Sequence, residues 1–168
     1  MKTIIAVTVA ALLTACATTS DKGGPSATVT LRPASGTQVH GALTFTQMGD
    51  KVRITGEIAA HDPGPKGFHI HEKGDCSDPK AMSTGGHFNP TKGKHGAPGT
   101  GHAGDFGNLV FNEYGKAVVN MTVSGISVSK DAPNGIIGRG VIIHMAPDDL
   151  KTDPTGNAGG RAACGVIE

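Results

Sequence analysis

Five of the eight histidines of this 168-residue chain lie in one glycine-rich stretch between residues 67 and 108. The stretch has little hydrophobic periodicity, and an irregular segment of this length is uncommon in a compact domain unless something orders it. Imidazole is the commonest side-chain ligand for metals in proteins, so we predict that bound metal orders the stretch. The residues concerned, with the one aspartate that follows the last histidine, are His69, His71, His87, His95, His102 and Asp105.

The first two histidines alternate with apolar residues in the sequence Phe68-His69-Ile70-His71. Successive side chains of a strand point to opposite faces, so the two imidazoles share one face and the apolar pair shares the other. Their roots lie about 7 Å apart on a strand, close enough to converge on one ion. Gly67 leaves room for a close backbone approach. The pattern predicts a strand with one metal-binding face and one core face.

The remaining members form a set that suits zinc. Three imidazoles and one carboxylate give a tetrahedral site with no position left for water, which is typical of structural zinc. The set consists of His87, His95, His102 and Asp105.

His69 and His71 need further partners, and the residues offer two candidates. His144 ends the apolar run 141–143, which is typical of a buried strand. The other candidate is His87 again, through its second ring nitrogen, because two nearby cations make the loss of both ring protons feasible. An all-imidazole site suits copper, which binds nitrogen strongly and cycles between two oxidation states. His40 and His61 stand apart from these patterns and are interpreted as solvated surface groups.

Residues 1–16 have the pattern of an export signal. Lys2 gives a positive start, residues 4–13 are apolar, and small residues precede Cys16. The run is too short to cross a bilayer, which takes about 20 apolar residues. The sequence Leu-Thr-Ala-Cys at 13–16 is similar to a bacterial lipobox, in which the cysteine is lipidated and becomes the new N-terminus. The alternative is an ordinary signal peptide cut nearby.

These features divide the chain into three parts. We predict a signal peptide over residues 1–15, then a lipidated Cys16 with a flexible tether over residues 16–26, because ATTSDKGGPS is small and polar. The globular domain is expected over residues 27–168, a length that fits one domain with a sizeable core.

The expected domain is all-β. Polarity alternates along several short segments, 26 glycines favour tight turns and long loops, and no helical periodicity is sustained after the leader. Residues 125–138 form a longer connection, which is consistent with a Greek-key crossing. The predicted antiparallel strands include residues 27–31, 43–46, 51–55, 108–111, 117–123 and 141–143.

The charge pattern excludes two classes of partner. The chain has 15 basic and 14 acidic residues, with no Lys/Arg cluster and no basic amphipathic helix. We therefore expect no nucleic acid and no membrane contact except through a lipid on Cys16.

Several blocks resemble the signature sequences of copper/zinc superoxide dismutases, and the leader points to an exported bacterial member. The resemblance covers residues 27–168 and implies a Greek-key antiparallel β-sandwich or flattened barrel, immunoglobulin-like, with long metal-binding and active-site loops. The blocks, which occur in the family's order, are GFHIHEKGDC, GGHFNP, HGAPGTGHAGDFGNL, GIIGRGVIIH and GNAGGRAACGVI.

The resemblance also implies the ligand sets. Copper is expected on His69, His71, His87 and His144, and zinc on His87, His95, His102 and Asp105. Asp148 is expected to link His69 to His95. Cys76 and Cys164 are expected to form a disulfide, which persists in an oxidising compartment; the alternative is two free thiols.

The implied activity is the dismutation of superoxide to oxygen and hydrogen peroxide. His87 is expected to bridge the metals and carry a proton, and Arg161 to attract and orient the anion. Pro154 stands where several relatives carry a steering lysine, so long-range attraction falls to other lysines. The candidates are Lys73, Lys92, Lys94 and Lys151.

Two other classes compete with the enzyme: a binding module that keeps the fold without the activity, and a periplasmic copper or zinc buffer. The complete copper set together with Arg161 favours the enzyme. The leader predicts a periplasmic protein that is lipid-anchored to a membrane. The sequence leaves the oligomeric state open, with a homodimer among the options.

Overall fold

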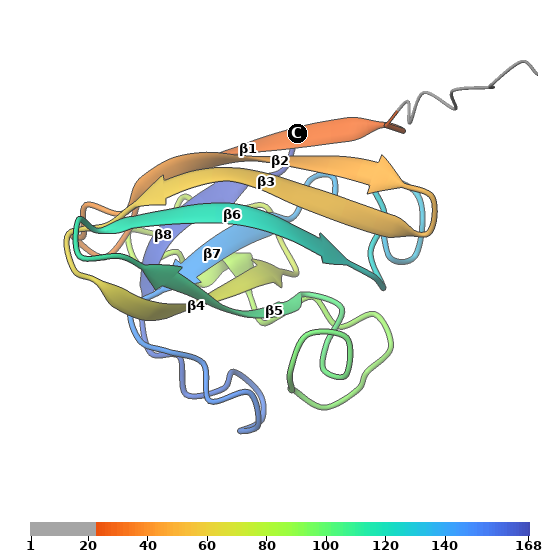
Figure 1. The fold of residues 1–168 in the computed structure, drawn as a ribbon. Coiled ribbons are helices and arrows are strands. Elements are labelled where there is room, and N and C mark those ends of the chain that lie inside the picture. Colours follow the sequence, from red (N-terminus) through yellow and green to blue (C-terminus); the bar gives the residue numbers. More distant parts are fainter. Residues whose placement is uncertain (1–22) are drawn as a thin grey trace, which may run out of the picture.

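The computed structural model describes residues 23–168 and shows eight antiparallel strands in one sheet that nearly closes into a flattened barrel (Figure 1). The predicted all-β Greek-key fold is confirmed. The predicted signal peptide and Cys16 lie outside the described residues. The strands are β1 (Ser26–Pro33), β2 (His40–Met48), β3 (Lys51–Ala59), β4 (Gly64–His71), β5 (Asp105–Phe111), β6 (Lys116–Val123), β7 (Gly140–His144) and β8 (Arg161–Val166).

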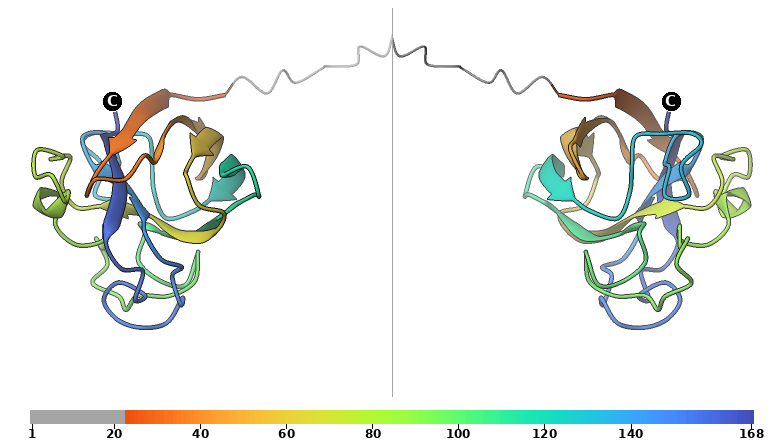
Figure 2. Two further views of the ribbon diagram at one scale, coloured as in Figure 1. Left: turned by 90° about the vertical axis from the view of Figure 1, so that its left-hand side faces the viewer. Right: turned by 90° about the vertical axis from the view of Figure 1, so that its right-hand side faces the viewer.

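The strand order around the barrel is β5-β4-β7-β8-β1-β2-β3-β6. β1 joins the two layers, because residues 26–31 pair with β2 while Arg32 and Pro33 pair with β8. Figure 2 shows the two layers end on. The order differs from the chain order where β3 neighbours β6 and β4 neighbours β7, and these crossings make the Greek key.

The core lies between the layers. Ala27, Val29 and Leu31 of β1 alternate with exposed residues, and β3 repeats the pattern with Val52 and Ile54. This alternation is what a sheet with one buried and one wet face requires. Complete burial of each large apolar side chain stabilises the fold by about 1.5–3 kcal/mol relative to exposure.

β4 and β7 differ from the other strands because both their faces are covered. Residues 67–71 are all buried, as is the whole of β7. Two long connections, residues 72–104 and 145–160, pack against the outer face of these strands (Figure 1). The first contains a single turn of 3₁₀ helix, Met82–Thr84. Polar side chains on this outer face are therefore enclosed between strand and loop.

Within residues 23–168, no helix has the length and apolar character needed to cross a bilayer. His40 and His61, predicted to be surface groups, are both exposed.

Candidate metal centre

His69 and His71 of β4 point together to the loop-covered side of the barrel, while Phe68 and Ile70 enter the core. Gly67 makes room for them. A Cβ at this position would lie 3.2 Å from the His69 ring and 3.0 Å from Ala158. A side chain at residue 67 would therefore crowd the ring, so the sequence has glycine where the strand carries its first imidazole.

The structure brings the buried titratable side chains of this face into two groups. Within each group, one possible ligand atom per residue lies within 4.8 Å of all the others. The four-histidine group contains His69, His71, His87 and His144, and the histidine–aspartate group contains His87, His95, His102 and Asp105.

His87 belongs to both groups and lies between them. Its ring centroid is 4.0 Å from that of His69 and 5.0 Å from that of His71. On the other side, its Nδ1 lies 2.8 Å from Oδ1 of Asp105. The two nitrogens of one imidazole thus face two different ligand groups.

Hydrogen bonds to backbone carbonyls fix the tautomers of two members of the four-histidine group. Nδ1–H of His71 donates to the carbonyl oxygen of Gly85 at 3.0 Å, and Nδ1–H of His144 donates to that of Gly159 at 3.3 Å. Because these oxygens only accept, the ring proton is held on the outer nitrogen and the lone pair of Nε2 faces inward. This is the form in which imidazole binds a metal.

The inward-facing nitrogens provide the test of whether metals fit. Among residues 23–168, six buried side-chain nitrogens have no hydrogen-bond partner, and all six belong to the two groups. An unpaired buried polar atom costs about 1–3 kcal/mol, so the set is understandable only as ligands. The atoms are Nδ1 of His69, His95 and His102 and Nε2 of His71, His87 and His144.

The histidine–aspartate group also contains ring nitrogens that make no hydrogen bond. Nδ1 of His95 and of His102 lie 3.0 and 3.3 Å from the oxygens of Asp105, yet neither makes a hydrogen bond to them. The nitrogens therefore point past the carboxylate. Asp105 instead accepts backbone hydrogen bonds from His102 and Gly96 at 2.8 and 3.2 Å.

Burial keeps three imidazoles of the four-histidine group neutral. Desolvation, followed by the neighbouring His87, lowers the pKa of His69, and desolvation lowers the pKa of His71 as well. Burial also lowers the pKa of His144 to about 4. For Asp105, burial raises the pKa, but hydrogen bonds from His87 and the backbone outweigh it and the net direction is downward. His69, His71 and His144 are thus neutral imidazoles and Asp105 is an ionised carboxylate, the states that bind cations.

Asp148 lies between the two groups and is buried. Nε2–H of His69 donates to its Oδ2 at 2.8 Å and Nε2–H of His95 to its Oδ1 at 2.9 Å. Asn108 holds this residue through a reciprocal pair of 2.7 and 2.9 Å with its backbone. One carboxylate therefore orients a ring of each group. Neighbouring Asp149 is exposed and accepts hydrogen bonds from its own turn.

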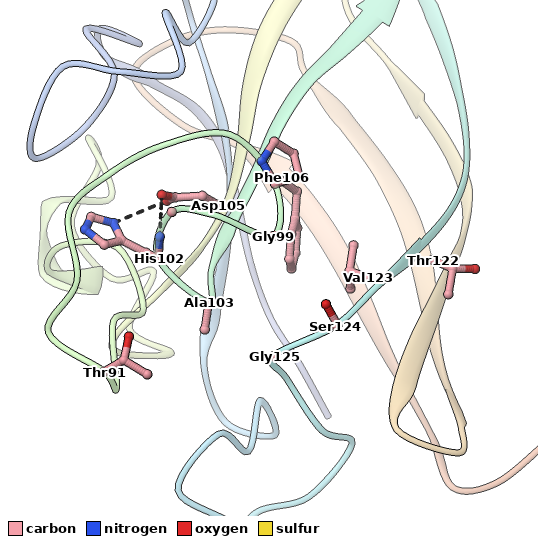
Figure 3. Close-up of a pocket in the computed structure, with 12 residues that line it drawn as sticks. Thr91, Gly99, His102, Ala103, Asp105, Phe106, Thr122, Val123, Ser124 and Gly125 are labelled. Carbon is pink, nitrogen blue, oxygen red and sulfur yellow. Dashed lines mark hydrogen bonds and ion pairs between the residues drawn. The ribbon is translucent and has the colours of Figure 1, made fainter.

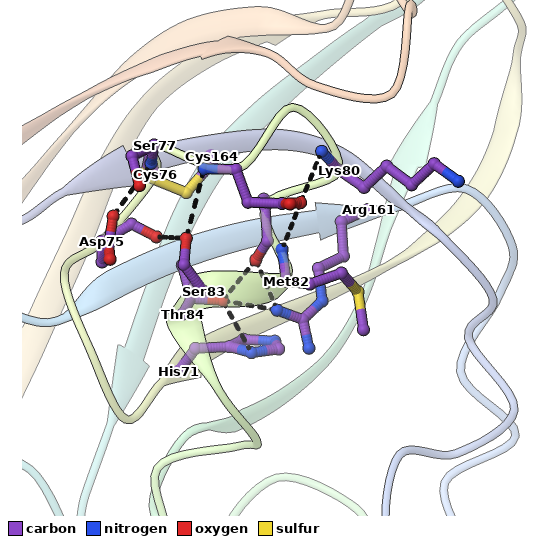
Figure 4. The surroundings of a disulfide bond; sticks show 12 residues. His71, Asp75, Cys76, Ser77, Lys80, Met82, Ser83, Thr84, Arg161 and Cys164 are labelled. Atoms are coloured by element: carbon purple, nitrogen blue, oxygen red, sulfur yellow. Dashed lines mark hydrogen bonds between the residues drawn. A yellow bond between two sulfur atoms is a disulfide. The ribbon is translucent and has the colours of Figure 1, made fainter.

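Arg161 begins β8 and is half-buried (Figure 4). Its Nη1 donates to the carbonyl of Ala81 and the hydroxyl of Thr84, and its Nη2 to the carbonyl of Gly85, each at 2.6 Å. Burial lowers the pKa of this guanidinium. The ordinary pKa of arginine is so high that the group remains charged. The guanidinium is fixed by the same loop that holds the Nδ1 of His71.

The predicted disulfide is confirmed. Cys76 and Cys164 are bonded, with a Cα–Cα distance of 5.9 Å, and join the loop that holds Arg161 to the strand that carries it (Figure 4). A closed loop of 88 residues implies a stabilisation of about 4–5 kcal/mol in the chain-entropy model.

A cavity of about 290 Å³ lies behind the histidine–aspartate group, where β5 and β6 leave the barrel open (Figure 3). Phe106 and Val123 line it on the barrel side, and His102 and Asp105 on the loop side. His102 and His95 are each 6% exposed, whereas His69 and His71 are fully buried. The histidine–aspartate group is thus the one nearer to the surface.

Comparison with known protein families matches residues 39–167 to the family described as copper/zinc superoxide dismutase (SODC). The chain belongs to this family. It is therefore an oxidoreductase of the superoxide dismutase class, with copper and zinc as its cofactors, and the two ligand groups are able to bind both metals.

A solved structure described as "Crystal Structure Analysis of the clock protein EA4" is also similar. It is 45% identical in sequence, covers 84% of this chain and 92% of its own, and superposes with a TM-score of 0.76. The match supports the same fold at the level of the whole domain.

Three residues with roles at the site were not singled out by sequence reasoning. Asn108 fixes Asp148, Thr84 fixes Arg161, and Asp153 accepts a hydrogen bond from the backbone of His95 at 2.6 Å. Each is a short polar residue in a loop or at a strand, a type too common there to stand out. Only Asn108, which lies within β5 in the block GDFGN, offered a local signal.

Proposed function

We propose that the four-histidine group holds copper, that the histidine–aspartate group holds zinc, and that His87 bridges the two. The observation that carries the proposal is the position of His87. Its Nδ1 faces Asp105, while its Nε2 is buried and unpaired beside the other three histidines. Because His87 belongs to both ligand groups, a cation in each group would be bound by a different nitrogen of the same ring, and two nearby cations make the loss of both ring protons feasible.

The chemistry divides between metal and protein. When bound, copper supplies a one-electron couple and zinc a redox-inert charge. Two superoxide anions and two protons become one oxygen and one hydrogen peroxide, so a proton must arrive as the second anion is reduced. We assign one proton to Nε2 of His87, which takes it up between the two half-reactions and passes it to the second anion. The other comes from solvent.

Asp105 and Asp148 keep His87 and its neighbours in place during this exchange. Asp105 approaches Nδ1 of His87 at 2.8 Å, so the ring would stay anchored on one side while Nε2 takes up and releases its proton. Asp148 holds His69 and His95 at fixed orientation. Groups of this kind set ligand geometry and basicity at metal sites.

Arg161 is proposed to attract and orient superoxide. Its three hydrogen bonds fix the guanidinium without consuming its charge, because none of the acceptors is a carboxylate. Lys73, Lys92, Lys94 and Lys151 are all exposed and available for long-range attraction. A surface hollow of about 480 Å³ reaches His87 between residues 86–93 and 153–155. The positive groups around these loops would concentrate a small anion near it.

The test measures metals and activity together. Protein loaded with both metals should contain one copper and one zinc per chain and dismutate superoxide. His87→Gln should lose the activity and the tight binding of both metals, whereas the exposed His61→Gln should retain them. A single metal per chain in the wild type would refute the bridged site. Full metal content without dismutation would favour a binding module or a metal buffer.

We further propose that the chain is a bacterial, periplasmic lipoprotein anchored through Cys16, with membrane contact only through the lipid. The support is the apolar leader and the Leu-Thr-Ala-Cys sequence before the domain. Mass spectrometry of the native protein should find a lipidated N-terminus at Cys16, and Cys16→Ala should release soluble, active protein. An unmodified terminus elsewhere would refute the anchor. A homodimer is the state to test first by sizing.

A further inference from the structure

Arg139 lies beside the metal centre without belonging to either ligand group. Its guanidinium carbon is 3.6 Å from the centroid of the Phe88 ring. Its Nη1 donates to the carbonyl of Glu72 at 2.9 Å, and its Nε to the carbonyl of Gly135 at 2.6 Å. The side chain therefore uses its planar fork on two backbone carbonyls and its face on an aromatic ring.

The contacted residues directly follow two of the histidines. Glu72 follows His71, and Phe88 follows His87. The two segments run antiparallel, with a backbone bridge between His71 and His87 and a hydrogen bond of 3.0 Å from the Glu72 nitrogen to the carbonyl of Gly86. The guanidinium of Arg139 thus contacts both segments of this short ladder, at the residues that directly follow the two paired histidines.

The ladder sets the backbone of His87 against that of His71, and one side of it is a loop. The backbone nitrogen of Phe88 donates to the carbonyl of Ile70 at 2.8 Å, which anchors the loop to β4. Arg139 comes from a third segment, at the start of β7. It therefore connects the loop, β4 and β7 at the point where their histidines meet.

We propose that Arg139 is a positioning residue that fixes His87 against His71 and thereby sets the affinity of the four-histidine group for copper. The inference rests on the proposed function. Arg139 contacts the residues that directly follow His71 and His87, which are two of the four ligands of that group. In the histidine–aspartate group, only His87 is next to a residue that Arg139 contacts. Loss of the guanidinium should consequently weaken copper binding more than zinc binding. Substitution of outer residues at metal sites typically costs about 10–100-fold in affinity.

Three variants and two readouts test the role. Arg139→Gln should bind copper about 10–100-fold more weakly than wild type in chelator competition, with a smaller change for zinc. The electron paramagnetic resonance spectrum of its bound Cu(II) should shift. Arg139→Lys should be intermediate, because it keeps the charge but lacks the fork. Arg53→Gln is the control, since Arg53 is exposed and its guanidinium bonds only Asn120 among the described residues.

The outcomes separate the two proposals. Wild-type copper affinity and an unchanged spectrum in both Arg139 variants would overturn the positioning role while leaving the proposed function intact. Equal losses for copper and zinc, together with a lower melting temperature of the metal-free protein, would also overturn it by showing a general structural role. Wild-type protein that binds no copper would overturn both proposals.

Discussion

Acidification should destabilise the metal-free protein well before its carboxylates titrate. His69, His71 and His144 are buried, and desolvation lowers the pKa of each. In the unfolded chain the same side chains take up protons below about pH 6.5. The unfolded state therefore binds more protons than the folded state once the pH falls below that value. The contribution of the neutral histidines to the free energy of unfolding is therefore fully present above about pH 6.5. It is lost as the pH falls toward the pKa of these histidines in the folded state.

The size of the effect follows from the same shifts. For His144 the pKa changes from 6.5 to about 4, which corresponds to a loss of about 3.5 kcal/mol at about 1.4 kcal/mol per pH unit. His69 and His71 are shifted in the same direction and add losses of the same sign. Three histidines together give a slope approaching about 4 kcal/mol per pH unit below about pH 6. Domains have a total stability of only about 5–15 kcal/mol, so unfolding is expected in the mildly acid range.

Urea unfolding of metal-free, disulfide-intact protein at several values between pH 7.5 and 4.5 measures the slope directly. Replete protein provides the comparison, because bound metal must also leave before the histidines can protonate. The expected metal-free slope corresponds to two to three protons taken up on unfolding. A slope below about one proton would refute the reasoning, since it would mean that the histidines already contact solvent in the metal-free fold.

Three further predictions concern single side chains. Arg161→Ala should lower the dismutation rate constant at least about tenfold and weaken its salt dependence. The loss of its three hydrogen bonds, at about 0.5–1.5 kcal/mol each for this half-buried group, should lower the free energy of unfolding by about 2–4 kcal/mol. Pulse radiolysis at several ionic strengths and urea unfolding measure the two effects, and wild-type rates with an unchanged salt slope would exclude guidance. Asp148→Asn should weaken metal binding about 10–100-fold in chelator competition, whereas Asp149→Asn, at an exposed turn, should not; equal values for the two would contradict the bridging role. Cys164→Ser should lower the free energy of unfolding by about 4–5 kcal/mol in urea unfolding under oxidising conditions. Reduction of the wild type should reproduce this loss, and a variant as stable as the wild type would show that the disulfide does not stabilise the fold.

The strand content was predictable because alternation is a local property. Residues 27–31, 117–123 and 141–143 were predicted as strands and lie within β1, β6 and β7. Lengths were less predictable. The prediction placed strands at 43–46 and 51–55, whereas β2 and β3 extend to His40 and Ala59. Gly41 and Gly56 interrupt the alternation there, but they are needed because a Cβ on either would meet the backbone of the neighbouring strand. The alternation of polarity therefore fails where the backbone of the neighbouring strand leaves no room for a side chain.

The metal ligands could be predicted from the sequence, whereas the residues that position them could not. Imidazoles and carboxylates that face one point are recognised by residue type and by strand period, so His69 and His71 could be placed on one face from four letters of sequence. Asn108 and Arg139 act on backbone groups that lie 40 and 67 residues away in the chain, and the Thr84 hydroxyl accepts from a side chain 77 residues away. No local pattern records which carbonyl a folded loop will present to a side chain. The metal ligands can therefore be inferred from composition and spacing, whereas the geometry that tunes them depends on the register between the two long loops and β7, which only the folded structure provides.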